Sequence, residues 1–218
     1  MLTPLQEQIA SIVGRVLEGS DFALAGGAAL ISLGLVDRST RDLDFFGSSS
    51  RQLAEKLPFI IEALTELGLE TKVDRQTANF TRLEVKGRGE ETEVDFGIDY
   101  RLFPSLDGTF SLVLSDRELA VDKVLAVFGR AEPRDFVDLA ALLRFFEITD
   151  LFKDAVRKDQ GFSLEVFAEM TNRLDVLPRR EFEINDAEFA ELKRTVESWR
   201  QIVMEAVIAR DRDRGMER

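Results

Sequence analysis

The sequence predicts an α+β protein, with a mixed β-sheet and its flanking helices first and a helical bundle after it. Three observations support this class. Runs with strand character fall between residues 21 and 115, whereas apolar residues follow helical spacing from Ser115 to the end. Hydrophobic residues make up 44% of the 218 positions, which is enough for a sizeable core. We expect one domain over residues 1–114 and a helical region over 115–218 that completes a cleft.

Each element follows from a local signal. The first segment is an amphipathic helix with Thr3 as its N-cap and Pro4 at its first position. Residues 49–68 form a helix or a helix pair, interrupted or bent at Pro58. Residues 87–91, GRGEE, are typical of a hairpin turn. Strands are predicted at 21–26, 42–46, 69–75, 78–87, 92–99 and 109–115, and further helices at 28–35, 116–129, 133–147, 163–174 and from about Asn185.

Composition excludes several kinds of chemistry. The chain has no Cys and no His, so thiolate nucleophiles, Ser-His triads and Cys or His metal sites are impossible. Its net charge of −12 argues against a broad basic face for nucleic acid, so any such contact must be a local patch. No apolar run is long enough to span a bilayer, and no signal peptide is apparent. We therefore expect a cytoplasmic protein that does not enter membranes.

Two acidic strands carry the clearest chemical signal. In DLDFF, Asp42 and Asp44 point to one face of the strand, and Leu43 and Phe45 point to the other. Paired carboxylates repel each other, and Mg²⁺ would remove that penalty while leaving positions for phosphate oxygens. In TEVDFGID, Asp95 would supply a third carboxylate if its strand lies beside DLDFF. The alternative for both strands is a solvated acidic face above a buried apolar one.

A pair of glycines precedes the first acidic strand. Gly26 and Gly27 lie between a predicted strand and a predicted helix, where backbone N–H groups can approach a phosphate. Taken alone, two glycines favour a plain strand-to-helix turn. Together, however, strand, glycines, helix, strand and D-x-D describe a phosphate cradle followed by a metal-binding pair, which favours triphosphate chemistry.

The segment GGAALISLGLVDRSTRDLDFF resembles the core motif of polymerase-β-type nucleotidyltransferases, and more narrowly that of the AbiEii/AbiGii toxin family. The matching residues are Gly26, Gly27, Arg38, Thr40, Asp42, Asp44 and Phe45. The second family motif is matched by DKVLAVFGRAEPRDFVDLAAL, through Lys123, Arg130, Arg134, Asp135, Asp138 and Leu139. The resemblance covers roughly residues 20–145. It departs from the family at Ala28, where a Ser or Thr hydroxyl usually binds phosphate.

The resemblance implies a nucleotidyltransferase-like fold and a metal-dependent enzyme that transfers NMP from an NTP to an acceptor hydroxyl. It implies Mg²⁺ or Mn²⁺ as the cofactor, a cognate antitoxin as partner, and the 3′ end of tRNA as an RNA acceptor in some members. The implied metal ligands are Asp42, Asp44 and Asp95, and the implied catalytic residues are these three with Lys123 and Asp135. The implied nucleotide-binding residues are Gly26, Gly27, Arg38, Thr40, Lys123, Arg130, Arg134 and Asp138.

For the residues of the second motif, a structural role is the alternative to a role in binding or catalysis. Lys123 lies among apolar helix residues and needs either an anion, such as a triphosphate, or a nearby acid. A phosphate role predicts that Lys123→Ala weakens NTP binding and leaves the fold intact. Asp135 and Asp138 share a helix face, and Pro133 places Asp135 in the first turn, where the helix dipole favours an acid. Arg130 and Arg134 either pair with these acids or contact phosphate or base.

Two further functions remain open from the sequence. Ala28 favours a non-catalytic nucleotide-binding or interaction module of the same fold. The acidic net charge favours nucleotidyl transfer to a small-molecule or protein hydroxyl. Several basic residues lie in or near the strand region: Arg75, Arg82, Lys86, Arg88 and Arg101. They are typical of solvated strands, and they are also the best candidates for an acceptor-binding patch.

Overall fold

The computed structural model describes residues 1–216, with side chains as far as residue 209. The chain divides into two compact units, Met1–Leu119 and Ala120–Arg218, and the boundary falls inside helix α4 (Asp116–Gly129). The first unit contains a seven-stranded mixed sheet with helices, and the second is helical. This order confirms the predicted α+β class. No helix within residues 1–216 is long and apolar enough to cross a bilayer.

The sheet of the first unit has the strand order β3-β4-β5-β2-β1-β7-β6. Strands β2 and β5 run parallel, as do β1 and β7, and the remaining neighbours are antiparallel. The strand bounds are β1 Ala23–Ala25, β2 Asp42–Gly47, β3 Glu70–Gln76, β4 Phe80–Gly87, β5 Glu90–Ile98, β6 Leu106–Asp107 and β7 Leu112–Val113. Strand β2 therefore lies between β1 and β5, near the middle of the sheet.

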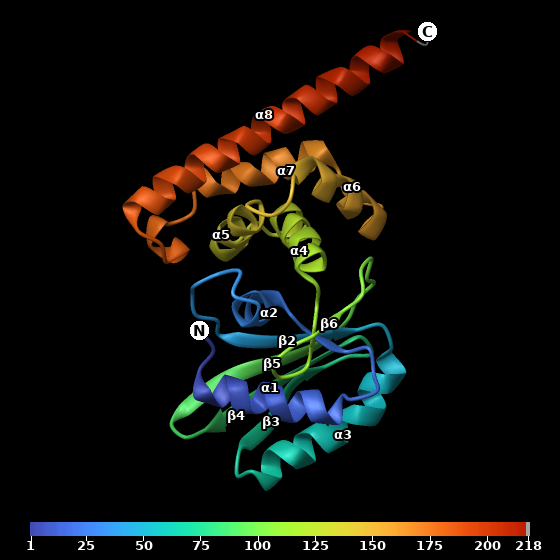
Figure 1. The fold of residues 1–218 in the computed structure, drawn as a ribbon, viewed down its shortest axis with the longest axis vertical. Coiled ribbons are helices and arrows are strands. Elements are labelled where there is room, and N and C mark those ends of the chain that lie inside the picture. The colour runs from blue at the N-terminus through green and yellow to red at the C-terminus, as the bar shows by residue number, and fades with distance from the viewer. Residues whose placement is uncertain (217–218) are drawn as a thin grey trace. The chain divides into compact units, whose positions relative to one another are not determined.

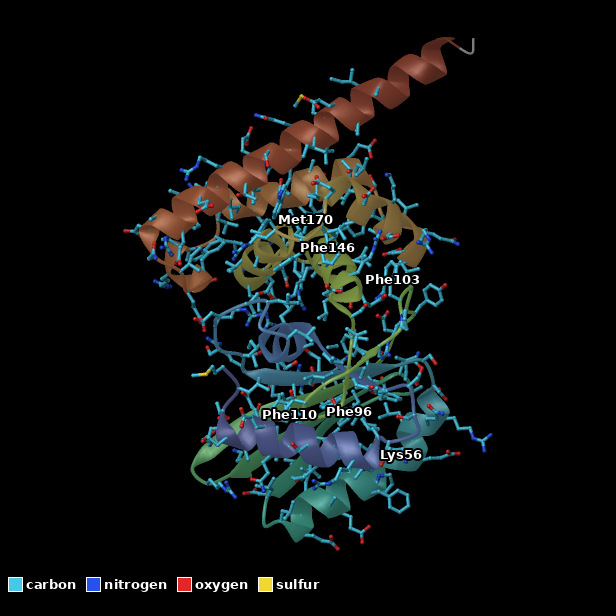
Figure 2. All side chains as sticks on the ribbon, in the orientation of Figure 1. Lys56, Phe96, Phe103, Phe110, Phe146 and Met170 are labelled. Carbon is cyan, nitrogen blue, oxygen red and sulfur yellow. The ribbon has the colours of Figure 1, made fainter. Side chains whose placement is uncertain are left out.

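Helices α1 (Pro4–Val16) and α3 (Ser50–Glu66) pack together and cover one face of the sheet, and α2 (Gly26–Ser32) lies on the other side (Figure 1). The covered face carries the core. Phe45 and Phe96 are fully buried there with ring centroids 5.7 Å apart, and Phe96 lies between the sheet and α1 in Figure 2. The alternating side chains of β2 and β5 consequently point to the opposite face.

The helix and turn signals of the first unit mostly act as expected. Thr3 caps α1 in a capping box with Gln6, and Pro4 is its first residue, as predicted. The β4–β5 hairpin closes through Arg88 and Gly89 at φ 55° and 80°, the backbone of a two-residue type I′ turn. Of the two expectations for residues 49–68, a helix or a helix pair, the structure has one helix, because α3 continues through Pro58.

In the second unit, aromatic side chains meet from α4, α6 (Ile148–Lys158), α7 (Leu164–Thr171), α8 (Asp186–Met216) and the loop before α7. Phe162 lies 5.1 Å from Phe128, and Phe167 lies 5.0 Å from Phe152 and 6.3 Å from Trp199, measured between ring centroids. Helix α8 contacts α5 and α7. The helices that follow α4 are α5 Pro133–Leu142, α6 Ile148–Lys158, α7 Leu164–Thr171 and α8 Asp186–Met216, with short 3-10 helices at Asn172–Asp175 and Arg179–Phe182. Helix α6 is not among the helices predicted from the sequence.

Candidate active site

The acidic residues of β2 and β5 lie side by side. In the parallel β2–β5 pair, Asp44 is in register with Asp95, and Asp42 is in register with Glu93. Register partners on neighbouring strands point to the same face, so the sheet brings these side chains together. Leu43, between the two aspartates of β2, is fully buried on the opposite face.

The glycine turn lies against the cluster of carboxylates formed by Asp42, Asp44 and Asp95, called the carboxylate group below. Ala25, the last residue of β1, is in register with Asp44, and Gly26 follows at φ +58°. A Cβ on Gly26 would lie 2.0 Å from Oδ2 of Asp44, a distance that no side chain tolerates. Gly26 is therefore required twice: for its left-handed backbone and for the close approach of that backbone to the carboxylate.

Gly27 makes a second close approach. A Cβ at this position would lie 2.8 Å from Nη2 of Arg38 and 3.0 Å from Oγ1 of Thr40. Residues of the first motif that are more than ten positions apart in the sequence thus meet over the start of α2. Ala28 is fully buried in α2, so its methyl group faces the interior of this unit.

Thr40 orients Asp42. The Thr40 hydroxyl donates a hydrogen bond of 2.9 Å to Oδ1 of Asp42. The backbone carbonyl of Thr40 accepts a hydrogen bond of 3.1 Å from Nε2 of Gln6. Nε2 of Gln6 also donates to the buried Thr92 hydroxyl at 3.3 Å. Gln6 was not predicted as a supporting residue. The capping box identifies its place in α1, but only the folded chain shows that its amide holds the loop before β2.

Arg82 on β4 binds the third carboxylate. Its Nε and Nη2 donate to the two oxygens of Asp95 at 2.8 and 2.6 Å, and Nη1 lies 2.9 Å from Glu93. The hydrogen bond to Asp95 is the main reason that the pKa of the Arg82 guanidinium is raised, and the charges of Asp95, Glu93 and Asp42 add to this. The Asp95 side chain is 8% exposed, so its negative charge is balanced within the protein.

The residues of the second motif form a buried ion cluster in the helical unit. Nζ of Lys123 lies 3.1 Å from Oδ1 of Asp135 and 2.8 Å from Oδ2 of Asp138. The Lys123 side chain is 7% exposed, and both aspartates are fully buried. Arg130 donates to both oxygens of Asp135, at 2.9 and 3.1 Å. The lysine that needed an anion therefore has two carboxylates from α5.

Asp135 also serves the start of α5. Pro133 is the first residue of this helix, and the backbone N–H of Glu132 donates to Oδ2 of Asp135 at 3.3 Å. Burial alone would raise the pKa of Asp135. The hydrogen bonds and positive charges of Arg130 and Lys123 outweigh burial, so the pKa of this carboxyl lies below its ordinary value. Arg134 pairs with Glu132 at 3.2 Å.

The fold of this chain is also found in solved structures. JHP933 from Helicobacter pylori is 18% identical, with 99% of each chain covered and a TM-score of 0.57. The nucleotidyltransferase toxin MenT4 (Rv2826c) from Mycobacterium tuberculosis H37Rv is 17% identical, with 92% of this chain and 82% of that chain covered and a TM-score of 0.55. The antibiotic-resistance factor ANT(2'')-Ia is 12% identical over 70% of this chain and 90% of that chain, with a TM-score of 0.51. At these identities the likeness establishes the fold alone.

Sequence comparison identifies the family. A comparison with curated proteins gave no significant match. The sequence model of a family described as "Nucleotidyl transferase AbiEii toxin, Type IV TA system" matches residues 10–209. That match includes both motifs and most of each structural unit, and it agrees with the resemblance carried by the motifs. The chain belongs to the AbiEii nucleotidyltransferase toxin family.

Proposed function

We propose that this protein is a metal-dependent nucleotidyltransferase that transfers NMP from an NTP to an acceptor hydroxyl, as the toxin of a toxin–antitoxin pair. One observation carries the proposal. Asp44 lies in register with Asp95, near Asp42, with the backbone of Gly26 packed against its carboxylate. A rigid group of carboxylates beside a glycine-lined turn fits a divalent cation with a triphosphate.

The donor set suits a hard cation. All three candidate ligands are carboxylates, the type that Mg²⁺ and Mn²⁺ prefer. Asp42 and Asp44 are half-buried and lie on a strand near the middle of the sheet, so a cation can reach both from solvent. Asp95 fits as the third ligand because an oxygen that accepts one hydrogen bond from Arg82 still has a second lone pair. A bound cation would supply charge stabilisation for the phosphoryl group.

The chain's own residues would then act as follows. Backbone N–H groups at Gly26 and Gly27 would bind the triphosphate, with Arg38 beside them. Thr40 would keep Asp42 oriented through its hydrogen bond. The acceptor hydroxyl would form the new bond to the α-phosphate, pyrophosphate would leave, and the carboxylate group would take up the hydroxyl proton.

The residues of the second motif have a proposed role that is more indirect. We infer that Asp135 and Asp138 hold the Lys123 ammonium in place, and that Arg130 and Arg134 are further cations for the nucleotide. Phosphate contact by Lys123 stays a prediction, because in this structure both of its carboxylate partners already balance its charge. A tRNA acceptor and a cognate antitoxin are proposed from family membership.

The variant Asp44→Asn tests the function. Transfer to total RNA from each labelled NTP should fall by about a thousandfold or more, because several kcal/mol of metal-dependent stabilisation are lost. Melting should be unchanged or raised in EDTA, since one of several neighbouring negative charges is removed, and the shift on adding Mg²⁺ and NTP should shrink. A lower melting temperature in EDTA with an unchanged metal-induced shift would show that Asp44 is purely structural.

A second candidate rests on Ala28. The hydroxyl that usually binds phosphate at this position is replaced by a buried methyl group, which favours a non-catalytic nucleotide-binding module. Metal and NTP binding without release of pyrophosphate would select this module. Release of pyrophosphate without labelling of RNA would instead select a small-molecule or protein hydroxyl, in keeping with the net charge of −12.

A further inference from the structure

A β-bulge in the edge strand changes which residue faces Arg82. Val73 on β3 is in register with Leu83 on β4, and the next pair is Arg75 with Arg82. Asp74 is the extra residue of the bulge and has no partner in the register. An uninterrupted antiparallel register would instead place Asp74 opposite Arg82, a complementary pair.

The bulge also changes the face to which Arg75 belongs. Without it, Arg75 would be in register with Thr81, which is buried on the side that α1 and α3 cover. With it, Arg75 shares the open face with Arg82 and the carboxylates. Like charges directly opposite each other on an antiparallel pair are destabilising. The fold thus gives up a favourable pair and accepts an unfavourable one at this point.

The ring of Phe80 holds both guanidinium groups. The Cζ atoms of Arg75 and Arg82 lie 5.6 and 5.9 Å from the Phe80 ring centroid. Cation–π contact offsets part of the repulsion and fixes both groups on one surface. Arg82 already binds Asp95 and Glu93, so Arg75 is the cation of this ring that can take an external anion.

Arg75 differs from the other cations of this face in its partners. Lys72 pairs with Glu84, Lys86 with Glu91, and Arg82 with Asp95 and Glu93. Among the residues whose side chains the structure describes, Arg75 has no carboxylate partner, although the protein has 41 acidic residues. Its side chain is exposed, so an external anion can reach it.

The strand order shows where Arg75 and Arg82 lie relative to the proposed NTP site. The carboxylates lie on β2 and β5. The glycine turn follows β1 on one side of them, and Arg75 and Arg82 lie on β3 and β4 on the other side. With strands about 4.8 Å apart, β1 and β4 are separated by about 14 Å. A ligand phosphate on Arg75 would therefore approach the carboxylates from the side opposite the triphosphate.

We propose that Arg75, held with Arg82 on the ring of Phe80, is a phosphate-binding subsite for the acceptor. This inference rests on the proposed function. The ligand is a phosphodiester of a single-stranded nucleic acid whose hydroxyl reaches the carboxylate group. Recognition of one phosphate by a local arginine reconciles a nucleic-acid acceptor with an acidic protein.

Arg75→Gln tests the subsite by binding alone. The probes are a fluorescent single-stranded oligoadenylate, total tRNA and each NTP, titrated into the full chain without transfer. Affinity for the oligonucleotide should fall about fivefold, as expected for one exposed charge-assisted contact. The slope of log K against log salt should become shallower by about 0.7, the value for one phosphate of a single strand. NTP affinity should stay constant.

Controls separate local recognition from general charge. Arg51 on α3 is an exposed arginine away from this face, and Arg51→Gln removes the same charge. Arg75→Glu should weaken oligonucleotide binding further while keeping or raising the melting temperature, since it creates an opposite-charge pair with Arg82.

Three results would overturn the proposal. The first is equal weakening by Arg51→Gln and Arg75→Gln. The second is a loss of NTP affinity while RNA affinity stays constant, which would assign the arginines to NTP binding. The third is a lowered melting temperature with no change in binding, which would make Arg75 a structural support for Phe80. None of these readouts requires transfer, so the proposed function can fail in the Asp44→Asn assay independently.

Discussion

Asp42 and Asp44 on the sheet and Asp135 and Asp138 in the helical unit have opposite surroundings. On the sheet, Asp42 and Asp44 are half-buried, and the backbone of Gly26 packs against the Asp44 carboxylate. In the helical unit, Asp135 and Asp138 are fully buried and bind the ammonium of Lys123. Both sets belong to family motifs, so their presence in the sequence does not separate the roles.

The difference lies in solvent access and charge balance. A carboxylate that is fully buried and bonded to cations is costly to disturb, because its removal or that of its partner leaves an uncompensated charge. A carboxylate that lies partly open to solvent on a rigid strand can exchange partners at a lower cost. We therefore expect substitutions in the helical cluster to act mainly on stability, and those in the sheet cluster mainly on ligand binding and transfer.

Lys123→Met should produce the largest change in stability. Breaking a buried ion pair from one side costs about 3–5 kcal/mol in free energy of unfolding, because two buried carboxylates lose a cation. This expectation differs from the prediction that loss of Lys123 leaves the fold intact, since the structure supplies its two buried partners. Urea unfolding of the variant is the measurement.

Lys153→Met is the matched control for that experiment. Lys153 pairs with Asp150, but the two side chains are 74% and 53% exposed. The loss should be below about 1 kcal/mol, as for other surface pairs. Equal losses for the two lysines would contradict the distinction drawn between the buried cluster and exposed charge.

Gly26→Ala should have an intermediate effect on stability, with a large loss of metal binding. A left-handed non-glycine residue costs about 1–3 kcal/mol, and the new methyl group would displace the Asp44 carboxylate. Gly34 provides the control because its φ of +69° is similar, and a Cβ there would meet no atom within 4 Å. Unfolding and Mn²⁺ titration are measured for Gly26→Ala and Gly34→Ala. The difference between the two variants reports the contact with Asp44. Identical behaviour of the two variants would remove Gly26 from the site.

The smallest effect is the change of one stability difference with pH. The pKa of Asp135 is lowered in the folded protein, so this carboxylate stabilises the fold above its ordinary pKa of about 4. That contribution is lost as pH falls through the lower folded value. Asp135→Asn should therefore be less stable than the parent at neutral pH, and the gap should narrow in acid. Free energies of unfolding across this range test it, with the exposed Glu55→Gln as a control expected to follow the parent. If the difference in free energy of unfolding between the parent and Asp135→Asn stays constant with pH, titration of Asp135 does not contribute to stability.

Much of the fold follows from local signals in the sequence. The capping box at Thr3, the alternation in β2 and the Arg88–Gly89 turn each depend on residues a few positions apart. Helix α6 also has such a signal, since Ile148, Leu151, Phe152 and Ala155 follow helical spacing and are buried, although it was not predicted. Pro58 shows the limit of these rules, since the local signal allowed one helix or two and α3 continues through the proline as one.

The site divides in the same way. By itself the sequence determined the candidate aspartates, the glycine turn and the two motifs, because side-chain alternation and glycine backbone freedom are properties of short segments. Only the tertiary structure decided that β5 lies beside β2, that Arg82 binds Asp95, that a bulge turns Arg75 to the open face, and that Lys123 has buried partners. Strand order, register and ion-pair partners depend on contacts between distant segments, and those contacts form only when the whole hydrophobic core is buried.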